Sequence, residues 1–151
     1  MSLFGVAQRY WMEWRAKGKS YAELARSLQA EGEVVTRRFQ NGRDRAANRR
    51  TASHIVGIER WGQRRLRTLL GEPLVMDEYD GYRPGPDCTL RELACEFPHT
   101  RKETLALLRS LEDRNIPLTQ TVPHNESGPM SVGAWFVYFQ NHAGRESRFV
   151  R

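Results

Sequence analysis

Two ionisable residues, His142 and Glu146, lie one helical turn apart close to the C-terminal end of the sequence. They belong to a run of residues at alternating spacings of three and four, the spacing of the inward seam of a packed helix. An unpaired carboxylate at such a buried position costs several kcal/mol. Glu146 therefore requires a hydrogen-bond partner, a metal ion, a raised pKa or access to water. The seam comprises Val132, Trp135, Phe139, His142, Glu146 and Phe149.

The spacing of His142 and Glu146 suits metal binding, because side chains four residues apart on a helix present two ligands to one ion. Two other interpretations stay open. The two side chains either hydrogen-bond only to each other, or the helix frays near its end and leaves both in water. The pattern does not choose among these three.

His54 is the candidate for a third ligand. It lies on the flank of an apolar stripe that contains Ile58 and Trp61, turned about 40° from Ile58 at 100° per residue. It is either an ordinary half-buried histidine or part of a set of two imidazoles and one carboxylate. Such a set suits zinc, nickel, iron or manganese and leaves positions open for water or substrate. We expect His99 and His124 to be exposed.

Four long helical patterns position these residues. Capping boxes at Ser20 with Glu23 and at Thr89 with Glu92 begin two of them. The third helix should be kinked by Pro98 near its middle. The expected helices run from Ser20 to about Phe39, from about Asp44 to Leu70, from Thr89 through Leu111, and from the N-cap Ser131 towards Arg151.

Two long connections separate the helices, and a short amphipathic helix precedes them. Residues 74–88 form a broken crossover loop, and residues 115–130 contain three prolines, which permits a short extended piece but argues against a sheet. The aromatic side of the N-terminal helix, at Phe4, Trp11 and Trp14, must be covered by the bundle or by another subunit. The sequence predicts an all-α protein, a four-helix bundle with long crossover loops, forming one domain over residues 1–151.

Composition narrows the class of protein. Apolar residues make up 39% and charged residues 28%, and no apolar run approaches the ~20 residues of a membrane span. The N-terminal stretch lacks the pattern of a signal peptide, so we expect a cytoplasmic protein. Cys88 and Cys95 are expected to be free thiols. Nucleotide-binding glycine loops, the GxSxG elbow and the HExxH motif are absent.

The net charge of +6 keeps an anionic partner such as nucleic acid under consideration. Only three of the 24 basic residues are lysines, and the arginines are interleaved with acidic residues. The one dense basic stretch, Arg37 to Arg50, falls at an expected loop and helix start, where a solvated surface is the simpler interpretation. The acidic run at Asp77, Glu78 and Asp80 is likewise expected to be a solvated loop.

From Asn48 to the C-terminus, about two thirds of the chain, the order of features resembles the DinB-like (YfiT-like) superfamily of metal-dependent four-helix bundles. The first helix matches in kind only. The segments that carry the resemblance are HIVGIERW at 54–61, YRP at 82–84, TRKETLALLRSL at 100–111, VPHNESGPMSVGAW at 122–135 and NHAGRE at 141–146.

The resemblance implies a metal site. Members of that family bind a divalent ion, commonly zinc or nickel, through a histidine of the second helix and an HxxxH pair of the fourth. His54 and His142 match the first two ligands, and Glu146 stands where the family has its third histidine. This departure implies either a site of two histidines and one carboxylate or a site that has lost its metal.

The leading expectation is a metal-dependent enzyme in which His54, His142 and Glu146 hold the ion. The resemblance implies transfer of a low-molecular-weight thiol to a small-molecule electrophile, with hydrolysis as the second choice, and a homodimer. The rival expectation is a catalytically silent dimeric interaction or stress-related protein that contacts nucleic acid through its arginines.

Overall fold

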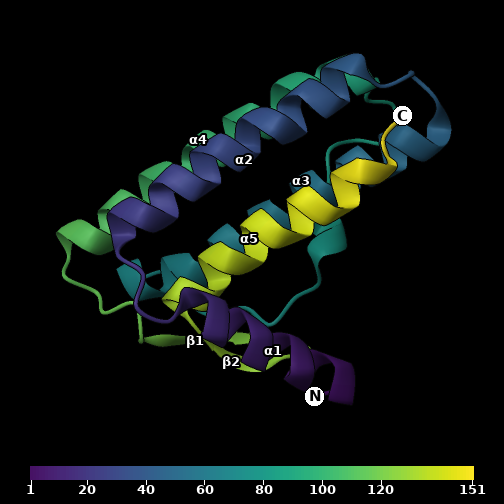
Figure 1. Cartoon of the computed structure of the whole chain (residues 1–151). Helices are drawn as coiled ribbons and strands as arrows, with labels where there is room; N and C mark the ends of the chain where they lie inside the picture. The colour runs from purple at the N-terminus through teal and green to yellow at the C-terminus, as the bar shows by residue number, and fades with distance from the viewer.

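Five α-helices make up most of the structure, a computed structural model that describes residues 1–151 (Figure 1). Two short strands and three single-turn 3-10 helices complete it. The helices are α1 (Leu3–Ala16), α2 (Tyr21–Asn41), α3 (Ala46–Leu66), α4 (Leu90–Asp113) and α5 (Val132–Glu146). The strands are β1 (Thr121–His124) and β2 (Gly128–Ser131), and the 3-10 helices are η1 (Arg67–Leu70), η2 (Tyr79–Tyr82) and η3 (Ser147–Phe149). The expectation of an all-α protein with a short N-terminal helix is confirmed.

Local sequence signals set the helix boundaries. The capping boxes at Ser20 and Thr89 are formed, because each side chain accepts a backbone N–H three residues on and the glutamate at that position returns the bond. Ser131 caps α5 by accepting from the N–H of Ala134. Helix α4 continues across Pro98 to Asp113. These starts lie where the sequence predicts them.

The four long helices contact one another in a closed ring, α2 with α4, α4 with α3, α3 with α5 and α5 with α2. Figure 1 shows α2 beside α4, with α1 and the two strands gathered at the end where α5 begins. Apolar side chains at helical spacing are buried along this ring. They include Leu24, Leu28, Val35 and Phe39 of α2, Ile55, Ile58 and Leu66 of α3, Leu93, Phe97, Leu108 and Leu111 of α4, and Trp135 and Phe139 of α5.

The connection before α5 forms an antiparallel hairpin, so the prediction of no sheet there is wrong. β1 pairs with β2 from Thr121 opposite Ser131 to His124 opposite Gly128. Gly128 supplies the turn with a φ of 74°, which residues with side chains rarely adopt. Prolines are tolerated because each strand has an unpaired edge, and both fall at one register position, Pro123 opposite Pro129.

The buried guanidinium of Arg65 in α3 joins the hairpin to the long loop after α3. It donates to the carbonyl of Pro123 at 3.1 Å, to that of Asp77 at 2.9 Å and to Oδ1 of Asn125 at 2.7 Å. Its planar group also lies over the ring of Trp61, 4.8 Å from the centroid. Two segments distant in the chain are thereby held by one side chain.

The two ends of the chain depart from expectation. Helix α5 ends at Glu146, and Phe149, expected on its inward seam, is 64% exposed, because it lies in the 3-10 turn η3, which does not continue the spacing of the α-helix. On α1, Met12 is buried but Phe4, Trp11 and Trp14 are exposed. The other helices therefore do not cover the aromatic side of α1.

No helix combines the length and the apolar character that crossing a membrane requires.

Candidate functional site

His54 of α3 and His142 of α5 meet across the interface between these helices. Their Nε2 atoms are 3.0 Å apart and their ring centroids 4.9 Å apart. In the absence of an ion, one Nε2–H donates to the other Nε2, which requires that the accepting ring be neutral. Two nitrogens bound to a tetrahedral zinc ion lie about 3.3 Å apart, so the two rings are spaced almost as ligands of one ion. The chain brings them together from 88 residues apart.

Burial keeps both imidazoles uncharged. The pKa of His142 is lowered to about 3, mainly by burial and to a smaller extent by the neighbouring His54 and Arg145. Burial also lowers the pKa of His54, although the nearby carboxylate of Glu146 acts in the opposite direction. Neutral imidazole is the form that binds metal ions, so the pair is held in the ligand state at neutral pH.

Glu146 lies one turn beyond His142, at the end of α5. Its Oε1 accepts from Nε of Arg145 at 3.1 Å, and its side chain is 26% exposed. No group of three or more histidine, cysteine, aspartate or glutamate side chains gathers closely enough to hold a metal ion. Two of the three candidate ligands are thus juxtaposed, while the third stands beside them with an arginine partner.

Aromatic rings enclose the two histidines. Tyr79 packs edge-on against His54 with centroids 5.0 Å apart, and Tyr138 lies 5.8 Å from His142. Between α1 and α5 a cavity of about 260 Å³ opens onto His142. Its walls come from Phe4, Ala7, Gln8, Trp11, Met12, Tyr138, Asn141 and Arg145. A small molecule with an apolar part can therefore reach this histidine.

The two remaining histidines have different environments. His99 is exposed, as expected. His124 is buried, so the prediction that it lies in an exposed loop is wrong. It forms the end of β1, and the hairpin turns it inward against Trp61 and Trp135, whose ring centroids lie 5.1 and 5.2 Å away. The period-two alternation of this segment was the signal that could have revealed its burial.

Sequence periodicity missed a cluster of buried charges. Arg101 of α4 donates from Nε and Nη2 to the two carboxylate oxygens of Glu59 of α3, at 2.7 and 2.9 Å. The third member is Glu31 of α2, 3.4 Å from Arg101 Nη1, and burial raises its pKa to about 7 while Arg101 opposes this shift. Thr104 Oγ1 also donates to Glu59 at 2.6 Å. In an amphipathic helical pattern, charged residues are assigned to the face exposed to solvent, and the cluster was missed for this reason.

The two cysteines are free thiols, as predicted. Within the acidic run, Glu78 and Asp80 are exposed, whereas Asp77 is partly buried and its carbonyl accepts from Trp61 Nε1 at 3.0 Å.

Comparisons of the chain with models of protein families, with curated proteins and with solved structures find no match.

Proposed function

We propose that this protein is a divalent-metal-dependent enzyme of the DinB-like type, in which α2 to α5 constitute the four-helix bundle. The observation that carries the proposal is the 3.0 Å approach of Nε2 of His54 to Nε2 of His142, in a setting that keeps both rings neutral. Buried polar groups brought together from separate helices in this way are characteristic of functional sites.

His54 and His142 would hold the ion through Nε2, and Glu146 would complete the set by exchanging Arg145 for the metal. Two imidazoles and a carboxylate suit zinc or nickel, and also iron or manganese. The bound ion supplies Lewis acidity, which lowers the pKa of a thiol or of water to the neutral range. A low-molecular-weight thiol is accordingly the proposed co-substrate, and hydrolysis is the second choice.

The chain itself contributes binding and exclusion of water. The cavity between α1 and α5 places the apolar side chains of Phe4, Trp11 and Met12 next to His142. These side chains would hold the apolar part of a small electrophile, and Tyr138 would separate the site from bulk water.

Metal binding by untagged protein tests the proposal. Titration of metal-free protein with zinc or nickel should show one ion per chain, and His142→Ala or His54→Ala should weaken binding by at least about 100-fold, because even changes that only touch a ligand's partners cost 10- to 100-fold. Glu146→Gln should weaken it less severely. His99→Ala is the matched control, since His99 is exposed. Equal affinity of wild type and His142→Ala, with both folded, would overturn the proposal.

A second candidate is a catalytically silent protein that acts as a homodimer, and the apolar surface of α1 favours it. Leu3, Phe4, Tyr10 and Trp14 are each at least 65% exposed on this one helix. Side chains of this kind are enriched where proteins associate. Sedimentation analysis distinguishes the candidates when it is combined with the metal titration. A dimer that Trp14→Asp dissociates, in a protein that takes up no metal, would favour this second function.

A further inference from the structure

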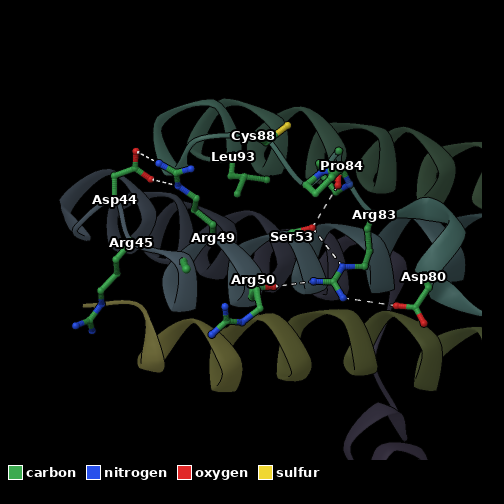
Figure 2. Close-up of a pocket in the computed structure, with 13 residues that line it drawn as sticks. Asp44, Arg45, Arg49, Arg50, Ser53, Asp80, Arg83, Pro84, Cys88 and Leu93 are labelled. Atoms are coloured by element: carbon green, nitrogen blue, oxygen red, sulfur yellow. Dashed lines mark hydrogen bonds and ion pairs between the residues drawn. The ribbon is translucent and has the colours of Figure 1, made fainter.

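A second cavity, of about 690 Å³, lies at the N-terminal end of α3. It is bounded by the first turns of α3, by the loop before α4 and by Leu93 (Figure 2). Only three of its 13 lining residues are apolar, so the cavity suits a polar ligand. His54, His142 and Glu146 are not among these residues, so the cavity and the proposed metal site have no residue in common.

The charge of the lining is strongly positive. Four arginines, Arg45, Arg49, Arg50 and Arg83, face only two carboxylates, Asp44 and Asp80, so that two positive charges are uncompensated. Arg45 and Arg50 are exposed, and neither forms an ion pair. The lining therefore carries two positive charges that no carboxylate of the cavity balances.

The other two arginines are held in fixed positions. Arg49 donates to both oxygens of Asp44 at 2.5 and 2.8 Å, and Asp44 also accepts from the N–H of Leu90 at 3.0 Å. Figure 2 shows Arg83 reaching from its loop towards α3, where it donates to Ser53 Oγ at 3.3 Å and to the carbonyl of Arg50 at 3.2 Å. Such prior positioning reduces the entropy cost of binding.

Glycine at position 57 allows this placement of Arg83. A Cβ at Gly57 would lie 2.6 Å from Cγ of Arg83, which is closer than such atoms approach each other. The stem of Arg83 thus rests directly on the backbone of α3. The first turn of this helix, at Ala46, also lines the cavity and has no side-chain cap, so its N–H groups add to the positive potential.

We propose that this cavity binds a small dianion, that is, a phosphomonoester or a dicarboxylate, between Arg50 and Arg45 at the rim and the fixed Arg49 and Arg83. Guanidinium groups bind phosphate and carboxylate oxygens through paired hydrogen bonds, and a dianion matches the two missing charges. A concave site of this volume is in the range of small-molecule pockets. Nucleic acid, in contrast, is bound along an extended basic surface.

The test is a titration followed by NMR of the metal-free, full-length protein at constant ionic strength. Inorganic phosphate is one probe, succinate the second, and acetate the monoanionic comparison. We expect saturable shifts of backbone amides around residues 44–53 and 83–88 with a dianion, and none with acetate. Stronger binding of phosphate or of succinate then identifies which of the two ligand classes fits.

Two double variants remove the same charge from different places. Arg45→Gln/Arg50→Gln takes away the unpaired arginines and should weaken binding of the dianion at least about tenfold. Arg26→Gln/Arg114→Gln removes two exposed arginines outside the cavity and should leave it unchanged. All four positions are exposed, so the variants should fold.

Three results would overturn the proposal: no saturable shifts, shifts outside the cavity, or equal weakening by both double variants. A fourth would be tighter binding of a short DNA or RNA duplex with a steep dependence on salt, because the arginines would then be nucleic-acid contacts. None of these results depends on the histidine pair, so failure here and failure of the metal proposal are separate outcomes.

Discussion

At the scale of single residues, His124 shows what burial does to a titrating group. Its Nδ1 accepts the backbone N–H groups of Glu126 and Ser127, each at 3.2 Å, which fixes the proton on Nε2. Nε2 is buried without a partner. Burial, followed by the charge of Arg65, lowers the pKa of His124 to about 4. The ring is therefore neutral in the folded protein throughout the neutral range.

The stability of the protein should consequently fall in acid. Because the folded pKa lies below the unfolded value, the unfolded chain binds the extra proton between about pH 6.5 and 4, and the stabilisation present above that window is lost as the pH falls through it. The contribution of His124 is on the order of 3 kcal/mol. His124→Asn keeps an acceptor but does not titrate, so its free energy of unfolding, measured in urea from pH 7 to 4, should vary less steeply.

The exposed His99 supplies the comparison for this experiment. His99→Asn should retain the slope of the wild type, since it changes an exposed side chain and leaves the buried His124 in place. His54 and His142 remain in every variant and add the same acid dependence to each. A His124→Asn slope equal to that of the wild type would show that the proton on His124 is not coupled to folding.

At the scale of elements, the approach of α3 to α5 depends on a glycine. A Cβ at Gly62 would lie 2.1 Å from Cε1 of Phe139 and 3.1 Å from Cζ3 of Trp135. These two helices also carry His54 and His142, so their close packing at Gly62 supports the approach of the two rings. The first half of α3 cannot move away from α5 without separating the histidines.

Gly62→Ala should therefore destabilise the protein by about 1–3 kcal/mol, the usual cost of overpacking a core, despite the better helix propensity of alanine. Gly144→Ala is the matched control, because its Cβ would meet Glu31 at 3.6 Å, an ordinary contact, and the change should be neutral or stabilising. Chemical denaturation measures both. Equal stability of the two variants would mean that α3 and α5 have room to separate.

The sequence predicted most of this architecture, because capping residues and apolar spacing are local. Ser20, Thr89 and Ser131 marked helix starts correctly, and the stripes of α2, α3 and α4 are buried. The hairpin was missed because three prolines masked the alternation that turns His124 inward. The 3.0 Å contact of His54 with His142 depends on the packing of two helices. Periodicity left open whether His54 joins the site, and the resemblance favoured it.

At the scale of the whole molecule, the buried charges of Glu59, Arg101 and Glu31 join α3, α4 and α2. Arg101 also donates to the carbonyl of Leu28 at 2.7 Å. The guanidinium of Arg101 is thus surrounded by three helices, and its charge is balanced only inside the protein. The set fixes how the three helices align.

Removing one carboxylate partner of Arg101 should destabilise the folded protein. Glu59→Gln leaves the buried guanidinium with Glu31, at 3.4 Å, as its only carboxylate partner and should reduce the free energy of unfolding by about 3–5 kcal/mol. Glu96→Gln removes the partner of Arg60 in a half-exposed ion pair and should cost less than about 1 kcal/mol. Thermal and urea denaturation compare the two variants. A small loss in Glu59→Gln would indicate that water reaches Arg101.

The links made by Arg65 bear on how the protein opens in solution. Pro123 of the hairpin and Asp77 of the loop after α3 are more than 40 residues apart in sequence, yet both accept hydrogen bonds from one guanidinium. If either segment unfolded alone, the guanidinium of Arg65 would become exposed to water while it was still hydrogen-bonded to the other segment. Local unfolding should thus release both together, and amide protons of the hairpin and of the loop around Asp77 should exchange with solvent as one cooperative unit.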